Sequence, residues 1–386
     1  MPKLSAQART TASAPILAAD MPSGPLQVMT WSCESLGDAD PQGLGLTYWF
    51  DTAPAGDPYA VSIRFSGRRT AGPDFPGTRD TFQAVRTLDR VLPGSGRVAL
   101  TERIGGIPAG TWEITATPVI PPAADGSPAE TGKPPASLPS GAATGMTTYF
   151  PVARVRAPGV RLGAWPALVG TGAAVALLVQ GVFSMQRQLP VGRLFLISVL
   201  ACLIGLAGAK TYYLLTHREE KPNPLTAGMS VQGFVIAAVT SVVLGSWWAG
   251  VPIGPMLDVT APGLLLGLTI GRLGCFFGGC CAGRPTASRW GIWSSDRRIG
   301  VRRIPVQLLE SGLAGVIAVT TSVAVATMDP PVDGLLFVAG FGAYTLGRQV
   351  LFPLRGIPRT TSHGRVVTLG LSAVLVVGAL ATLLAT

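Results

Sequence analysis

The second half of the chain contains seven long apolar stretches, each close to the length that crosses a lipid bilayer. A helix needs about 20 residues to cross a hydrocarbon layer of about 30 Å. The stretches cover residues 165–184, 194–215, 229–248, 257–278, 305–327, 333–353 and 366–385. Lys210 lies near the end of the second stretch and Arg348 lies in the sixth, and six spans are the main alternative. We therefore expect an α-helical polytopic membrane protein with about seven transmembrane helices.

Composition supports this interpretation. Hydrophobic residues make up 48% of the 386 residues and charged residues only 13%, which is too apolar for an ordinary soluble enzyme of this size. A net charge of +10 fits nucleic acid, an anionic membrane or membrane-topology signals. With the apolar stretches in view, we expect a multi-pass protein of the cell membrane and no nucleic-acid partner.

The N-terminal part differs in character from the membrane part. Residues 1–24 resemble a flexible tail without a secretory signal, and residues 121–160 form a Pro/Gly/Ala-rich linker with a possible last strand. Between them, short β-branched and aromatic runs such as YAVSIRF and TWEITATPV alternate with Gly, Pro and Asp clusters. We expect a β-sandwich-like domain over 25–120 and a membrane domain over 161–386.

Polar residues of the apolar stretches gather at one membrane face. Successive membrane helices run in opposite directions, so the ends of even-numbered spans meet the starts of odd-numbered ones. This rule brings together Lys210, Tyr212, Tyr213, Gln232, Arg272, Gln307, Glu310, Tyr344 and Arg348. An arginine within a hydrocarbon span needs a cavity and a partner, and a guanidinium matches phosphate oxygens. Two arginines at one level indicate an anionic ligand, although snorkelling or pairing with Glu310 is the structural alternative.

The segment around Arg272 reads GLTIGRLGCFFGGCCAGRPTASRWGIW and is rich in glycine. Glycines at the end of a membrane helix thin it, which is tolerated where the backbone borders a cavity. The following loop carries six arginines at 284, 289, 297, 298, 302 and 303 and one opposing Asp296. Such a loop either holds anionic head groups or acts as a topology signal.

Two motifs resemble the prolipoprotein diacylglyceryl transferase family. They are LDVTAPGLLLGLTIGRLGCFFGGCCAGRPT, from Leu257 to Thr286, and PVQLLESGLAG, from Pro305 to Gly315. Weaker similarities in AGMSVQG, AYTLGRQVLFPLR and VVTLGLS follow the family order. The resemblance covers about 220 residues, the membrane part only. It implies transfer of diacylglyceryl from phosphatidylglycerol, or another anionic phospholipid, to the cysteine thiol of a prolipoprotein.

The resemblance also implies roles for individual residues. Arg272 matches the arginine of the family signature and Arg348 a second essential arginine, and both would hold the lipid phosphate while a thiolate displaces glycerol phosphate. The candidate catalytic set is Arg272 and Arg348, which the resemblance implies, with Glu310 and Cys280, which their own chemistry suggests. The candidate substrate-binding set is Gly271, Gly274 and Gly283, which fit the family, together with Cys275, Gln232, Gln307 and Tyr344.

Several family positions hold other residues here. Cys275 stands where the family has Asn and Cys280 where it has Glu, while histidine, serine and tyrosine positions hold Gln232, Ile304, Val306 and Leu309. No histidine is left as a base for thiol deprotonation, so Glu310 or a cysteine of lowered pKa would have to serve. A non-catalytic lipid-binding or scaffolding descendant of the family is therefore the alternative. A small-anion transporter is less favoured, because the spans show no internal repeat.

The cysteines Cys275, Cys280 and Cys281 form the pattern C-x4-C-C. This pattern lacks the paired C-x2-C spacing of a structural zinc site, so we expect no metal and no cofactor. Packing residues, or a covalent intermediate on Cys280, are the remaining interpretations. Topology stays open, because the positive-inside rule favours a cytoplasmic arginine face whereas the family resemblance favours an outer one.

Overall fold

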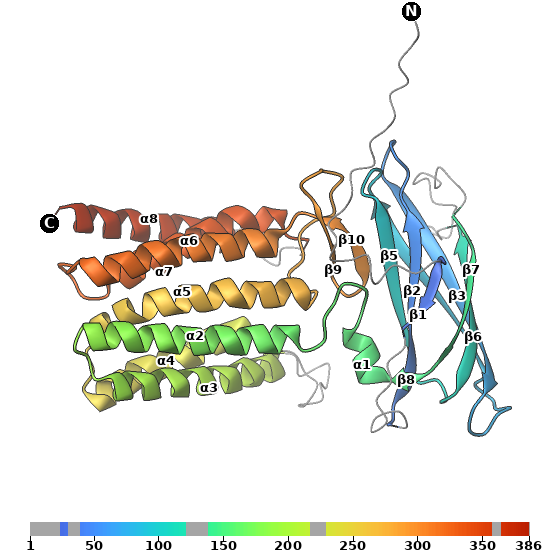
Figure 1. The fold of residues 1–386 in the computed structure, drawn as a ribbon, viewed down its shortest axis with the longest axis horizontal. Helices are drawn as coiled ribbons and strands as arrows, with labels where there is room; N and C mark the ends of the chain where they lie inside the picture. The colour runs from blue at the N-terminus through green and yellow to red at the C-terminus, as the bar shows by residue number, and fades with distance from the viewer. Residues whose placement is uncertain (1–23, 30–38, 121–137, 217–228, 357–363, 386) are drawn as a thin grey trace, which may run out of the picture. The chain divides into compact units, whose positions relative to one another are not determined.

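The computed structural model describes residues 24–29, 39–120, 138–216, 229–356 and 364–385, and these form two compact units (Figure 1). The β unit combines residues 1–162 with residues 284–304, and the helical unit combines residues 163–283 with residues 305–386. The predicted tail over 1–24 and the first part of the predicted linker lie almost wholly outside the described residues.

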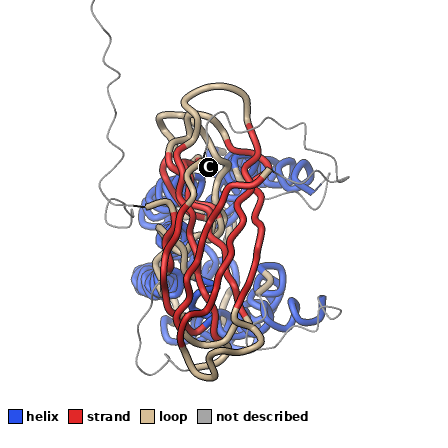
Figure 2. The backbone as a smooth tube through the Cα atoms, turned by 90° about the vertical axis from the view of Figure 1, so that its right-hand side faces the viewer, coloured by secondary structure: helices blue, strands red, loops and turns tan. Residues whose placement is uncertain are grey.

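The β unit consists of two antiparallel sheets, whose strands appear in red in Figure 2. The first sheet has the order β1-β2-β5-β10-β9, with β8 paired to β2, and the second has the order β4-β3-β6-β7. The elements are β1 (Leu26–Val28), β2 (Gln42–Asp51), β3 (Tyr59–Ala71), β4 (Thr81–Val91), β5 (Arg97–Gly105), β6 (Thr111–Val119), β7 (Gly141–Met146), β8 (Thr148–Tyr149), α1 (Phe150–Val155), β9 (Ile292–Ser295) and β10 (Ile299–Arg303).

One apolar core fills the space between the sheets. Tyr48, Phe65 and Trp112 are fully buried in it, and β6 alternates inward and outward residues along its length. Strands have a side-chain period of two, so one face of each sheet is apolar and must be covered. The predicted N-terminal β-rich fold is therefore confirmed.

The arginine-rich loop that follows α5 (Ile253–Phe277) in the sequence is part of the first sheet. Its strand β10 pairs with β5 through Ile299↔Leu100 and Gly300↔Ala99. The Trp293 ring stacks on Trp49 with 5.9 Å between ring centroids. Because apolar residues of this segment complete the sandwich core, it folds as a hairpin and not as an open basic loop.

The helical unit contains helices at all seven predicted positions (Figure 1). They are α2 (Ala164–Gln186), α3 (Val191–Thr216), α4 (Val231–Ala249), α5, α6 (Val306–Thr327), α7 (Leu335–Leu351), which the 3-10 turn η4 (Phe352–Leu354) extends, and α8 (Gly364–Leu384). Within the described residues, six are long and apolar enough to cross a membrane, and α4 is a shorter apolar helix. Helices satisfy every backbone polar group within the segment, as a bilayer requires. The predicted membrane fold is confirmed.

Small residues let neighbouring helices approach closely. A Cβ atom placed on Gly263 of α5 would lie 2.3 Å from the carbonyl oxygen of Ala176 on α2, and one on Gly267 would lie 2.9 Å from that of Gly172. A Cβ atom on Gly233 of α4 would lie 2.4 Å from the carbonyl oxygen of Gly208 on α3. The backbones of these pairs are therefore in contact.

Asp258 of α5 caps the start of α7 at the end of the bundle away from Arg272. Its buried carboxylate accepts hydrogen bonds from the backbone N–H groups of Gly334, at 2.8 Å, and Phe337, at 2.9 Å. The first N–H groups of a helix have no partner within the helix, and a carboxylate there also complements the helix dipole. This contact fixes where α7 begins, and Arg348 lies in the last turn of the same helix.

Candidate functional site

Three charged residues meet where α5 ends, α6 begins and η4 ends. The Glu310 side chain, on the second turn of α6, is almost fully buried and stands between two guanidinium groups. Its Oε2 lies 3.0 Å from Nε of Arg272, and its Oε1 accepts a hydrogen bond of 3.0 Å from Nε of Arg355 and a second from Nη2 of that arginine. The predicted meeting of Arg272 and Glu310 therefore occurs as an ion pair.

Arg355 is the member of this cluster that the sequence did not predict. Its side chain is 5% exposed, and it lies just beyond η4. In the sequence it follows the sixth apolar stretch and resembles a basic flank of the membrane. The only signal in the sequence was that Glu310 is a single carboxylate among several arginines, so that more than one arginine could pair with it.

Arg348 and Tyr344 of α7 face the same charged group. Arg348 is half-buried, interacts electrostatically with Arg272 and Arg355, and forms no ion pair with any carboxylate of the described chain. The Tyr344 hydroxyl is buried next to Arg272 and interacts with its guanidinium group.

The turn after α5 is held from two sides. The Gln307 side-chain amide donates a hydrogen bond of 3.0 Å to the carbonyl of Cys280. Gly283 forms an isolated β-bridge with Arg355, and the N–H of Gly356 donates to the carbonyl of Ala282 at 3.0 Å. Gln307 thus positions this turn. The turn then holds the backbone of Arg355 in place.

The predicted glycines have different surroundings. A Cβ atom on Gly271 would meet only Cγ2 of Val169, at 4.0 Å, so this position is open. Gly274 is buried against α2, where a Cβ atom would lie 3.2 Å from Cβ of Leu168 and 3.3 Å from the carbonyl oxygen of Trp165. Gly274 therefore lets α5 pack closely on α2.

The remaining predicted residues lie on α3 and α4. Gln232 belongs to the first turn of α4, and its side chain lies outside the described residues. Tyr212 packs on that helix, since a Cβ atom on Gly233 would lie 2.4 Å from its Cβ. Among the described contacts, Tyr212 belongs to the packing of α3 on α4. The arginine cluster is formed by residues of α5, α6 and α7 and by Arg355.

Three thiols lie together beside the charged cluster. The Sγ atoms of Cys275, Cys280 and Cys281 are all within 4.8 Å of one another, and they form the one group in the described chain with metal-ligand spacing. Hydrogen bonds with Cys275 and Cys280 lower the pKa of Cys281, and the charges of Arg355 and Arg272 lower it further against the effect of burial. The same thiol contacts raise the pKa of Cys280. The charges of Arg272 and Arg355 therefore favour a thiolate in this group.

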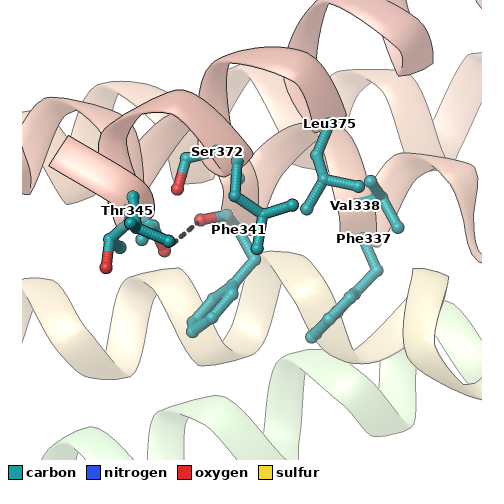
Figure 3. A pocket seen from close by; sticks show the side chains of 10 residues that line it. Phe337, Val338, Phe341, Thr345, Ser372 and Leu375 are labelled. Atoms are coloured by element: carbon teal, nitrogen blue, oxygen red, sulfur yellow. Dashed lines mark hydrogen bonds between the residues drawn. The ribbon is translucent and has the colours of Figure 1, made fainter. Parts of the chain in front are cut away.

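An apolar groove runs between α7 and α8 (Figure 3). Its polar groups are few, and the Thr345 hydroxyl already donates a hydrogen bond of 2.8 Å to the carbonyl of Phe341. Arg348 follows Thr345 by three residues on α7, so the groove leads toward the arginine cluster along this helix. The groove is lined by Phe337, Val338, Phe341, Gly342, Thr345, Val367, Thr368, Leu371, Ser372 and Leu375.

Comparison with known proteins places the membrane part in one family. The sequence profile of the prolipoprotein diacylglyceryl transferase family matches residues 155–385. A phosphatidylglycerol–prolipoprotein diacylglyceryl transferase of Chloroflexus aggregans is 35% identical over 133 residues, which are 33% of this chain and 44% of the relative. A transferase of the same name from Clostridium tetani is 25% identical over 210 residues, 52% of this chain and 84% of the relative. A third, from Rhodococcus jostii, is 28% identical over 169 residues, 41% of this chain and 47% of the relative.

Proposed function

The chain belongs to the prolipoprotein diacylglyceryl transferase family, and on that premise we propose that it transfers diacylglyceryl from phosphatidylglycerol, or a similar anionic phospholipid, to the cysteine thiol of a prolipoprotein. The match covers less than half of two of the relatives named above, at 44% and 47% of their lengths. The activity therefore has to be supported by the chemistry of this chain's own residues. We place the reaction in the cell membrane.

The excess of positive charge in the arginine cluster carries this proposal. Glu310 pairs with Arg272 and Arg355, and Arg348 lies near both arginines without an ion pair among the described residues, so three guanidinium groups face one described carboxylate. Buried charges are stable only when they are compensated by a partner. A phosphodiester supplies the missing negative charge, and Arg348 is the guanidinium that Glu310 leaves available.

The groove between α7 and α8 supports a lipid as the source of that phosphate. Its apolar lining suits an acyl chain, and Arg348 stands on the helix that forms one wall. A phospholipid with its phosphate at Arg348 would lay a chain along Phe341 and Leu375. A free inorganic anion would gain nothing from this groove.

The expected reaction is a displacement at the glyceryl carbon that carries the phosphate. The acceptor sulfur forms a bond to this carbon, the carbon–oxygen bond to phosphate breaks, and glycerol phosphate leaves with the electron pair. Arg272 and Arg348 stabilise the negative charge that grows on the leaving group, which is the largest catalytic effect in many active sites. Glu310 holds Arg272 and Arg355 with both oxygens and so acts as an anchor for them.

Transfer is tested with the full chain in phospholipid vesicles, labelled phosphatidylglycerol and a peptide with a lipobox cysteine. Arg348→Gln should lower transfer on the order of 100-fold, because a donor for the developing charge is lost. The matched control is Arg193→Gln in α3, whose guanidinium donates to the carbonyl of Ala249 at the opposite end of the bundle. Equal activity of the two variants would reject the proposed role of Arg348.

The alternative is a lipid-binding or scaffolding protein derived from the same family. The replaced family positions at Gln232, Cys275 and Cys280 favour it. Both functions predict that Arg348→Gln weakens binding of phosphatidylglycerol, whereas only the transferase modifies the peptide. Binding without any lipidated peptide, measured by mass spectrometry, would select the scaffolding function.

A further inference from the structure

The three thiols of Cys275, Cys280 and Cys281 form a compact group that has no role in the transfer reaction proposed above. Cys275 lies on the last turn of α5 and is buried, whereas Cys280 and Cys281 are partly exposed. Their Sγ atoms are all within 4.8 Å of one another. Thiolates around a zinc ion lie about 2.3 Å from it, so neighbouring sulfurs of a tetrahedral site are about 3.8 Å apart. Small rotations of the side chains therefore suffice to surround an ion.

The backbone of the turn is shaped to bring these thiols together. The N–H of Cys280 donates to the carbonyl of Cys275 at 3.1 Å, which folds the turn back over the helix end. Gly279 has φ +65° and Cys281 has φ +55°, both in the left-handed region. Glycine adopts this region freely, but a cysteine does so only where the surrounding structure imposes it, and such strain concentrates at functional sites.

The surroundings of the group suit a metal ion. Gln307 holds the carbonyl of Cys280, and the bridge between Gly283 and Arg355 holds the far end of the turn. Contacts of this kind orient the ligands of metal sites. Three thiolates and a divalent ion carry one net negative charge, which the nearby guanidinium groups of Arg272 and Arg355 compensate.

We propose that Cys275, Cys280 and Cys281 bind one Zn²⁺ through three thiolates and that its fourth position takes the thiol of the acceptor cysteine. Soft thiolate ligands select zinc over magnesium or calcium, and catalytic zinc sites have three protein ligands and one open position. The acceptor part of this proposal rests on the proposed transferase function. The three-thiolate site itself does not.

Zinc would supply the thiolate for which no histidine base is present. A thiol that coordinates zinc loses its proton, which passes to water. The bound sulfur then forms the bond to the glyceryl carbon, and glycerol phosphate leaves with the electrons of the broken carbon–oxygen bond. Glu310 is not needed as a base, which agrees with its pairing to two arginines.

Metal binding is measured on the full chain, purified in detergent under reducing, anaerobic conditions. We expect one equivalent of zinc by elemental analysis, and replacement by Co²⁺ should produce the sulfur-to-cobalt charge-transfer absorption of a thiolate site. Cys281→Ser should lose at least about 90% of the bound metal. The control is Cys202→Ser, which removes an exposed thiol of α3 and should leave the stoichiometry unchanged.

A second measurement avoids any dependence on folding of a variant. In the wild-type chain, Zn²⁺ should protect Cys275, Cys280 and Cys281 from alkylation, whereas Cys202 should react equally with and without the ion. Absence of stoichiometric metal in the reduced wild-type chain, or unchanged alkylation of the three thiols, would overturn the site. A disulfide between two of the thiols in the reduced preparation would do so as well.

The fourth position is tested by adding a lipobox peptide to the Co²⁺-loaded chain. The peptide with cysteine should increase the charge-transfer absorption by about one third, since a fourth thiolate joins three, and the peptide with serine should not. Metal binding without this change would refute the acceptor position. An increase in charge-transfer absorption without any transfer of diacylglyceryl would support the metal site and reject the transferase function. Full transfer by Cys281→Ser would refute activation by the metal.

Discussion

Glu310→Gln separates an anchoring role of this carboxylate from a role as a base. The substitution keeps the size of the side chain and one acceptor oxygen, but it removes the only negative charge that pairs with Arg272 and Arg355 in the described structure. The Glu310 side chain is 1% exposed, so water cannot reach this position to solvate the two arginines that lose their counter-charge. As an anchor, Glu310 should matter for folding and for the shape of the site, whereas a base would matter for transfer alone.

The expected magnitude follows from the geometry. Two unit charges about 4 Å apart interact by about 4 kcal/mol at an effective dielectric constant of about 20, and repulsion between the two arginines offsets part of this. Removing one partner of a buried pair typically destabilises a protein by about 3–5 kcal/mol. The glutamine oxygen retains one hydrogen bond, so we expect about 3 kcal/mol for Glu310→Gln.

Unfolding of the chain in detergent micelles, followed by helix content, measures this difference. The double variant Glu310→Gln, Arg355→Gln should recover part of the loss, since it removes one of the unpaired cations. Anionic phospholipid should bind more tightly to folded Glu310→Gln, because the cluster has gained positive charge, which is the opposite of Arg348→Gln. Wild-type stability of Glu310→Gln together with lost transfer would refute the anchoring role and restore the base.

Three further changes test the packing within the two units, each by the free energy of unfolding in detergent. Gly263→Leu should disrupt the contact of α5 with α2 and destabilise by about 3 kcal/mol or more, whereas Gly170→Leu on α2, where a Cβ atom meets nothing within 4 Å, should be nearly neutral. Asp258→Ala leaves the first N–H groups of α7 without their acceptor and should cost about 1–3 kcal/mol. Trp293→Ala removes the ring stacked on Trp49 and should destabilise the β unit by about 2 kcal/mol with little effect on the helical unit.

The membrane helices could be predicted because length and hydropathy determine them almost alone. A bilayer leaves a backbone no alternative to intrahelical hydrogen bonds, so an apolar run of the right length is enough. The predicted span 305–327 differs from α6 (Val306–Thr327) by one residue, and 333–353 differs from α7 (Leu335–Leu351) by two at each end. The stretch of α4 is the exception, because its described apolar part, Gly233–Ala249, is shorter than the others.

The site could be predicted only as far as helix direction determines it. The antiparallel rule brought Arg272, Glu310, Tyr344 and Arg348 to one level, and the contacts of Glu310 and Arg272 agree with that. Arg355 escaped prediction because η4 turns the chain inward after the apolar run, and no periodic pattern marks such a turn. The sequence singled out Cys275, Cys280 and Cys281, but it could not predict that their thiols lie together, because a helix end and a left-handed turn place them and the C-x2-C spacing does not describe that arrangement.

The β9–β10 hairpin changes the topology argument that the sequence left open. The positive-inside rule counts arginines in short loops, and folded domains cross the membrane largely regardless of their charge. Residues 284–304 belong to the β unit, and Arg303 is buried there in an ion pair with Asp296 at 2.7 Å. Arg355 pairs with Glu310 inside the helical unit and does not flank the membrane as a free charge. Once Arg303 and Arg355 are assigned to folded structure, the charge distribution gives weaker support for a cytoplasmic arginine face.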